Sequence, residues 1–279
     1  MEKRRHIFTD ILFCILKCTV YFAIWFATQY LGVYITFFAL AIKFRGSSAK
    51  AIARLTNAYS VHSLVIANAL MVLVFALVYK IIKKPLQERC DIKPKPLGTI
   101  LRVIVLGIIA QLAVQYILSA FIDKIPASWI KALEKNNASL TCAPESIVFI
   151  STVILAPIAE EILMRGLVLR SIRKATNTWT AIILSSVIFG LLHGNPIGII
   201  YAASLGVLLG WVSVKLDSIL PTIIMHMAFN WTSLALSSGS VSIIWALLFQ
   251  ISVPLMVFLI IKFARYKEPA PKNKDDDEV

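Results

Sequence analysis

The stretch AEEILMR, residues 159–165, places two carboxylates and a guanidinium inside an apolar run, 147–167, of membrane-spanning length. An ionisable group at that depth costs at least ~2.5 to 3.5 kcal/mol to insert, so such groups persist mainly where a polar cavity or a reaction needs them. Glu161 and Arg165 stand at i,i+4 with the acid first, the order that favours an ion pair on a helix. Glu160, turned by about 100°, has no such partner. We therefore expect Glu161 to be structural and Glu160 to be free for chemistry.

The composition around this stretch predicts an all-α polytopic membrane protein. Of 279 residues, 58% are hydrophobic and 15% are charged, which no soluble domain of average composition shows. Apolar runs of spanning length predict roughly eight transmembrane helices, at 21–42, 61–82, 100–121, 147–167, 179–193, 197–214, 219–236 and 241–263. We divide the chain into N-terminal helices (1–146), a motif-bearing core (147–236), and a last helix with a charged tail (237–279).

The net charge of +13 gathers between the predicted spans and not along a nucleic-acid-binding surface. With eight spans, four basic clusters fall on one side, which the positive-inside rule makes cytoplasmic together with both termini: 3–5, 80–95, 170–174 and the residues after 262. Lys43, Arg45, Lys50 and Arg54 would lie outside and disagree with the rule. We expect an integral membrane protein, in the plasma membrane if the cell is bacterial, with membrane lipid and no nucleic acid as partners.

The cysteines form no framework that predicts disulfides. Cys14 and Cys18 share a helix face, Cys90 falls in the basic cytoplasmic loop and Cys142 outside. We expect Cys90 to be a free thiol, with lipid attachment as the less favoured alternative. The charged tail, 272–279, is expected to be disordered.

Further polar residues recur at helical spacing in the second half of the chain. Phe189 and His193 stand one turn apart, as do His226 and Asn230, so each pair shares a helix face. A single buried histidine is most often a satisfied hydrogen-bonding group, and His62 is interpreted in that way. Glu160, His193, His226 and Asn230 together favour a functional cavity, because chance would have to place four unrelated polar residues there.

Helix-breaking and small residues accompany these motifs. Pro157 removes a backbone hydrogen bond one turn before Glu160, which in an α-helix would free the carbonyl of Val153. Gly190 and Gly194 match the small-xxx-small pattern by which membrane helices approach closely. The positions of the spans place Glu160 near mid-membrane and His193 nearer the outer face, unless that helix tilts or begins later.

The three motifs in this order, EExxxR at 160–165, FxxxH at 189–193 and HxxxN at 226–230, resemble the CPBP family of CAAX prenyl endopeptidases and bacteriocin-processing proteins, also called Abi. The resemblance covers about 147–236. It implies an intramembrane protease in which Glu160 activates water with His193, while His226 and Asn230 stabilise the oxyanion. Glu161, Arg165 and Phe189 would support the site.

The chemistry of these residues agrees with hydrolysis, since they provide a base and hydrogen-bond donors without a serine or cysteine nucleophile beside them. No HExxH motif occurs, yet Glu160, His193 and His226 could hold zinc, and the resembling family has been described both as metalloproteases and as glutamate proteases. The expected substrate is a membrane-associated peptide or protein, either prenylated or like a bacteriocin or pheromone. The alternatives are a non-catalytic self-immunity or envelope-resistance factor of the same fold and, with less support because no inverted repeat is visible, a small transporter.

Overall fold

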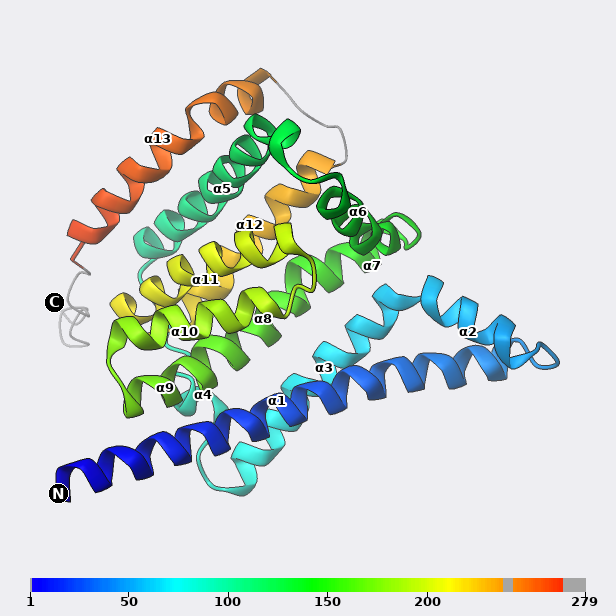
Figure 1. Ribbon diagram of the computed structural model, residues 1–279, viewed down its shortest axis with the longest axis horizontal. Coiled ribbons are helices and arrows are strands. Elements are labelled where there is room, and N and C mark those ends of the chain that lie inside the picture. Colours follow the sequence, from blue (N-terminus) through cyan, green and yellow to red (C-terminus); the bar gives the residue numbers. More distant parts are fainter. Residues whose placement is uncertain (1, 238–242, 268–279) are drawn as a thin grey trace, which may run out of the picture.

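The computed structural model describes residues 2–237 and 243–267, and within these ranges the chain is helical without β-strands (Figure 1). The N-terminal helices are α1 (Glu2–Lys43), α2 (Ala49–Ala58), α3 (Ser60–Ile81), α4 (Leu86–Arg89), α5 (Leu97–Ala120), η1 (Ile122–Lys124) and α6 (Ala127–Thr141). The segments that follow are α7 (Glu145–Phe149), η2 (Ile150–Leu155), α8 (Ala156–Glu161), η3 (Ile162–Leu169), α9 (Arg170–Ala175), α10 (Thr178–Leu191), α11 (Pro196–Leu216), α12 (Leu220–Ser237) and α13 (Ile243–Arg265).

The prediction of an all-α polytopic membrane protein is confirmed. In the described residues, six helices are long and apolar enough to cross a membrane: Thr9–Lys43, Ser60–Ile81, Leu97–Ala120, Glu145–Ala175, Pro196–Leu216 and Leu247–Arg265. The other two predicted spans are also helices. However, α10 has 14 residues, and α12, with 18, is not among the six. His226 lies in α12, and His193 lies in the turn that follows α10.

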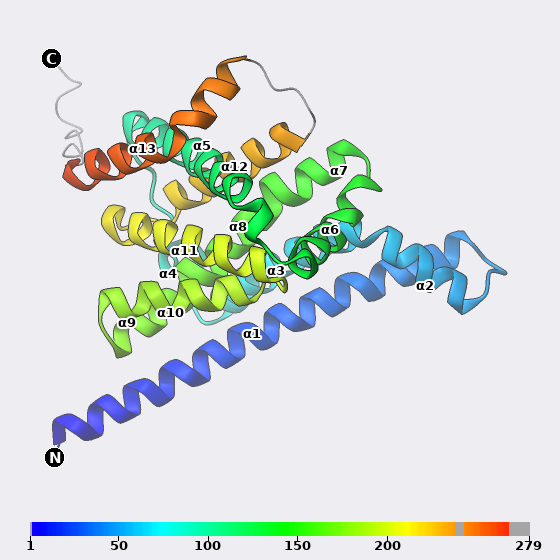
Figure 2. The same ribbon diagram turned by 45° about the horizontal axis from the view of Figure 1, so that its top comes forward.

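The long helices form an outer and an inner set. Both views place α1 and α13 at opposite edges of the bundle (Figures 1 and 2). The windows that qualify α1 and α13 as spans are 11% buried, whereas those of α5, of the segment Glu145–Ala175 and of α11 are 50% buried. The segment Glu145–Ala175 therefore runs through the middle of the protein, where neighbouring helices cover it.

Two glycines decide how closely the inner helices pack. A Cβ on Gly107 of α5 would lie 2.4 Å from the carbonyl oxygen of Met225 in α12, and one on Gly190 of α10 would lie 2.6 Å from that of Ile199 in α11. Gly190 thus has the packing role that we predicted. The same prediction is wrong for Gly194, because α10 ends at Leu191 and Gly194 adopts φ +70° in the following turn, with no atom near its Cβ position.

The basic clusters lie at one end of the bundle, as their spacing predicted. The start of α1, α4, α9 and the end of α13 are at that end, while α2 and α6 are at the other (Figure 1). Lys93 binds Asp217 across the chain, with 2.6 Å between Nζ and Oδ2, and Arg170 pairs with Asp91. Which end faces the cytoplasm stays a prediction, and the tail 272–279 lies outside the described residues.

The cysteine predictions hold in part. All four cysteines are free thiols. Cys90, however, is fully buried instead of lying open in its loop, since it packs on Gly166, where a Cβ would come within 2.5 Å of its Sγ. Burial raises the pKa of the Cys90 thiol to about 12. This thiol is therefore a packing group of the basic end and a poor site for a lipid.

Candidate active site

The helix that carries the two glutamates is not a regular α-helix. Two π-helical segments, η2 and η3, flank the single α-helical stretch α8. A π-helix shifts the acceptor of a backbone N–H from residue i−4 to i−5, and such segments are frequent at functional sites. For Pro157, which has no N–H, the acceptor without its partner in this register is the carbonyl of Thr152, and not that of Val153 as the α-helical register implied.

The freed carbonyl is bound by a motif residue. Asn230 Nδ2 of α12 donates to the Thr152 carbonyl oxygen at 2.8 Å. This contact joins α12 to the central helix, Glu145–Ala175, about two turns before Glu160. One N–H of the Asn230 amide is thereby engaged, and the second remains for another acceptor.

Glu161 and Arg165 form the ion pair that their spacing predicted. Arg165 Nη1 donates to Glu161 Oε1 at 2.6 Å, and the two side chains are 1% and 0% exposed. Arg165 Nη2 also donates to the carbonyl oxygen of Gly206 in α11 at 3.1 Å. The Phe189 ring lies 4.6 Å from the guanidinium carbon, so the cation rests on an aromatic face. Through Arg165 the pair links the central helix to Phe189 of α10 and to Gly206 of α11.

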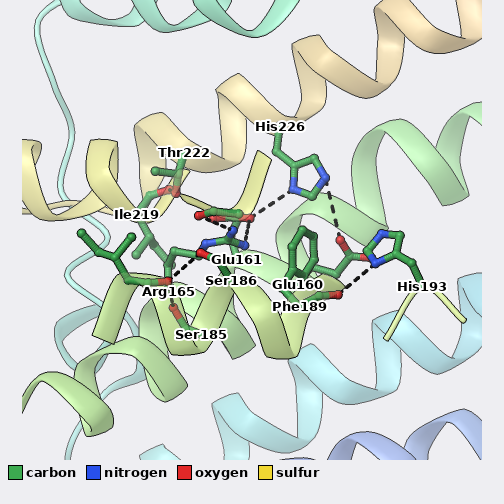
Figure 3. A network of polar contacts seen from close by, with 12 residues as sticks. Glu160, Glu161, Arg165, Ser185, Ser186, Phe189, His193, Ile219, Thr222 and His226 are labelled. Atoms are coloured by element: carbon green, nitrogen blue, oxygen red, sulfur yellow. Dashed lines mark hydrogen bonds and ion pairs between the residues drawn. The ribbon is translucent and has the colours of Figure 1, made fainter. Parts of the chain in front are cut away.

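The ion pair reaches further than sequence spacing could show. Glu161 Oε1 also contacts His226 Nδ1 at 3.1 Å (Figure 3). Because a carboxylate only accepts, this nitrogen carries the proton and donates it. The contact orients the imidazole and turns Nε2 toward the carboxylate of Glu160, where Nε2 and Oε2 are 3.8 Å apart. Glu161 is therefore a positioning residue for His226 as well as the partner of Arg165.

His193 is held in a similar way from the turn after α10. Its Nδ1 lies 3.0 Å from the carbonyl oxygen of Phe189 and must donate, because a carbonyl only accepts. The Phe189 ring meets both imidazoles edge to face, at centroid distances of 4.9 Å to His193 and 5.9 Å to His226. Phe189 thus packs between the ion pair and the two histidines, as a supporting residue would.

Glu160, His193 and His226 meet in one place. Figure 3 shows the Glu160 carboxylate turned toward both imidazoles. The expected difference in depth disappears because Glu160 lies fifteen residues before the end of α9 and His193 fifteen residues after the start of α10. The two helices are joined by a short turn, so equal lengths bring both side chains level. The 14-residue length of α10 accounts for this equal level.

These residues line a cavity of about 1020 Å³ that is open to the surroundings. Its wall includes Glu160, Phe189, His193, His226 and Asn230. The side chain of Glu160 is 31% exposed, whereas Glu161, the next residue, is completely buried. The cavity is large enough for several residues of a peptide, since ligand pockets typically measure about 300 to 1000 Å³.

The sequence analysis did not single out several polar residues of this wall, and three of them come from α5 and α11. Tyr201 of α11 has its ring 6.0 Å from that of His193, and Gln111 and Gln115 of α5 also line the cavity. The two glutamines carried a signal, because amides are unusual in an apolar run of membrane-spanning length. Tyr201 carried none, since an aromatic residue in a buried helix is ordinary packing.

The zinc hypothesis rests on residue types that bind zinc, and it stays a prediction. The nitrogens that the two imidazoles leave free, Nε2 of His193 and of His226, are donors that zinc accepts. Nevertheless, in the part of the chain that the structure describes, no three histidine, cysteine, aspartate or glutamate side chains gather as a metal site requires. We therefore assign no step to a metal.

The comparison with protein families identifies the segment that carries the motifs. Residues 143–232 match the family described as Type II CAAX prenyl endopeptidase Rce1-like. This match confirms the resemblance to the CPBP family and contains all seven motif residues of the site. No curated protein and no solved structure matches the chain.

Proposed function

We propose that this chain, whose residues 143–232 match the type II CAAX prenyl endopeptidase Rce1-like family, hydrolyses a peptide bond within the membrane by means of a water molecule activated by Glu160. The family supports a CAAX-type intramembrane endopeptidase in general. One observation carries the more specific proposal. Of two adjacent glutamates, Glu161 is buried in an ion pair, and Glu160 reaches a cavity beside two oriented imidazoles.

The proposed first step uses Glu160 and His193 around one water molecule. The Glu160 carboxylate accepts a proton from the water while the water oxygen attacks the carbonyl carbon of the scissile bond. His193 Nε2, left unprotonated by the Nδ1 contact with Phe189, accepts the second hydrogen bond of the same water. The proton taken by Glu160 then passes to the leaving nitrogen as the C–N bond breaks, so the carboxylate is regenerated.

His226 and Asn230 are the proposed donors to the oxyanion. Asn230 has one N–H beyond its contact with Thr152, and the residue lines the cavity. His226 uses Nδ1–H for Glu161, so it donates from Nε2 only when it carries a second proton. Donors placed in advance of the reaction stabilise charge that develops in the transition state.

The proposed substrate is a peptide or protein segment that reaches the cavity from the membrane, such as a prenylated C-terminal tail or a bacteriocin- or pheromone-like precursor. The cavity opens within a bundle of apolar helices, which favours a substrate that is itself held at the membrane. A zinc-dependent variant of the same reaction, with Glu160, His193 and His226 as ligands, is the alternative proposal. Prolonged chelation of the purified protein separates the two, since only the zinc enzyme loses activity and regains it with zinc.

The decisive experiment compares the membrane peptides of cells that contain the wild-type protein with those of cells that contain Glu160→Gln. We expect a peptide to accumulate uncleaved only in the variant, and the purified wild-type protein to cleave it. Glu145→Gln, which changes another carboxylate of the cavity wall, is the matched control. Identical peptides in the two strains, at equal protein levels, would contradict proteolysis and favour the non-catalytic immunity or resistance factor.

A further inference from the structure

Gln111 and Gln115, one helical turn apart, place two amide side chains on one face of α5. Both line the cavity, and Gln111 is 5% exposed. Within the described residues neither amide has a side-chain hydrogen bond to the protein, and neither is among the buried polar atoms left without a partner, so both amides reach the cavity. An amide that is accessible from the cavity and not engaged within the protein is suited to a ligand that enters there.

The position of the two glutamines follows from the packing of α5 on α12. The two helices run in the same direction (Figure 1), and Gly107 contacts Met225 and Ala228. One helical turn later, Gln111 therefore lies level with Phe229 and its neighbour Asn230. A further turn brings Gln115 level with Ser233, which also lines the cavity. The two amides thus form a row along α5, beside the residues of α12 that line the cavity.

The spacing of this row fits an extended polypeptide. Residues at i and i+4 are about 6 Å apart along a helix axis. In an extended chain, the residues that present their N–H and C=O to the same edge recur every second residue, at about 6.6 Å. A glutamine amide both donates and accepts, so each side chain can pair with the N–H and the C=O of one residue. Recognition through the main chain is also how exposed sheet edges bind extended peptides.

We propose that Gln111 and Gln115 bind the main chain of an extended peptide substrate, each pairing with one of two residues that are separated by a single residue. This inference rests on the proposed function, because it names how the substrate of that site is held. It places a binding element in the N-terminal half, outside the matched segment 143–232. Because main-chain groups are common to all peptides, these contacts hold the chain in register and leave the choice of side chains to other parts of the wall.

The test measures binding apart from cleavage. The probe is a synthetic farnesylated CAAX peptide, together with analogues in which one amide at a time is replaced by an ester, which removes a single N–H. Affinity is measured on the full-length Glu160→Gln protein, and cleavage on the protein that retains Glu160. Gln111→Met and Gln115→Met keep the size of the side chain and remove its hydrogen bonds. Gln29→Met is the matched control, because it makes the same change at a glutamine of α1 whose amide nitrogen is unpaired but which does not line the cavity.

We expect each of the two cavity variants to weaken binding about 10-fold, and Gln29→Met to leave it unchanged. Two ester positions, two residues apart, should weaken binding to the parent protein, and each should lose its effect in one of the two variants. Affinities within twofold of the Gln29→Met protein, or ester effects that persist in both variants, would overturn the inference, as would a peptide that fails to bind the Glu160→Gln protein at all.

The same measurements separate this inference from the proposed function. If the ester pattern appears but the protein with Glu160 never cleaves the peptide, the binding row stands and proteolysis fails. If the peptide is cleaved and the pattern is absent, proteolysis stands and the binding row fails. Gln115 is half-buried and therefore tolerates substitution, which keeps one informative variant even if Gln111→Met folds poorly.

Discussion

Two faces of the central helix, one residue apart, have opposite environments. The dry face carries Glu161 and Arg165, which are fully buried and paired at 2.6 Å, and Gly166, against which Cys90 packs. The face toward the cavity carries Glu160, which has no hydrogen bond in the described part of the chain and is partly exposed. The side chains are chemically identical, so the difference between Glu160 and Glu161 comes from a rotation of about 100° per residue. Structure and chemistry are thus separated on one helix without any change in residue type.

The largest expected effect is on the cavity face. Glu160→Gln should lower turnover about 100- to 10,000-fold, because it removes the base that accepts the proton of water. The melting temperature of the purified protein should stay within a few degrees of the wild type, since the Glu160 carboxylate is partly exposed and lies 3.8 Å from its nearest charged partner, Nε2 of His226. A variant that retains full turnover would contradict the assignment of Glu160.

On the dry face the same kind of change should act on stability. Arg165→Leu leaves the Glu161 carboxylate buried without its partner, a loss of about 3 to 5 kcal/mol in the free energy of unfolding. Thermal unfolding in detergent measures it. The double variant Glu161→Leu with Arg165→Leu should recover part of the loss, because it leaves no unpaired charge. Wild-type stability with lost turnover would instead move Arg165 into the chemistry.

The reaction rate of the Cys90 thiol measures how well the buried face of the central helix excludes solvent. Its pKa of about 12, compared with an ordinary 9.0, should make the thiol roughly a thousandfold slower to react than a free cysteine at neutral pH, since only the thiolate is nucleophilic. Labelling of the folded and the denatured protein by a maleimide measures this rate. Cys142, which is exposed, is the control within the same chain. Equal rates for the two thiols would show that the loop opens in solution.

The same reagent tests the orientation of the bundle. Two proteins are compared, each with a single cysteine. One carries Lys84→Cys, at an exposed position of the basic end, in place of the buried Cys90, and the other keeps only Cys142. The positive-inside rule predicts labelling of Lys84→Cys only after the membrane is opened, and of Cys142 in intact cells. The reverse pattern would invert the topology.

Asn230 is involved in both structure and proposed chemistry. One of its N–H groups donates to the Thr152 carbonyl oxygen of the central helix, and the other is the proposed donor to the oxyanion. Asn230→Ala should lower kcat about 100- to 1000-fold with KM largely kept, as the loss of an oxyanion donor does. Asn230→Asp keeps the size of the side chain but cannot donate when ionised, and it should be equally inactive. If Asn230→Ala lost stability but kept its kcat, the residue would serve only the Thr152 carbonyl.

The smallest effect is expected outside both faces, at the exposed ion pair of the basic end. The hydrogen bond from Lys93 holds the pKa of Asp217 below its usual range. A lowered pKa stabilises the fold above the ordinary value near 3.8, and this stability is lost as pH falls through the lowered pKa. Asp217→Asn should therefore cost at most about 1 kcal/mol at pH 7 and nothing in strong acid, because exposed pairs contribute little. A pH-independent loss would point to the backbone of the turn, where Asp217 has φ 46°.

The sequence by itself determined the class of fold and the pairing within each motif. Apolar length predicted the helices, and i,i+4 spacing predicted both the ion pair of Glu161 with Arg165 and the shared face of Phe189 and His193. These features depend on neighbours within about one helical turn. Local spacing therefore contains the information that specifies them.

The tertiary structure decided everything that joins separate helices. The contact of Glu161 with His226, the binding of the Thr152 carbonyl by Asn230 and the equal depth of Glu160 and His193 depend on a π-helical register and on the shortness of α10. It also buried Cys90, which the sequence placed in an open loop, and brought the glutamines of α5 to the cavity. Spacing along one helix cannot specify these contacts, because each depends on how two helices are rotated and shifted against each other.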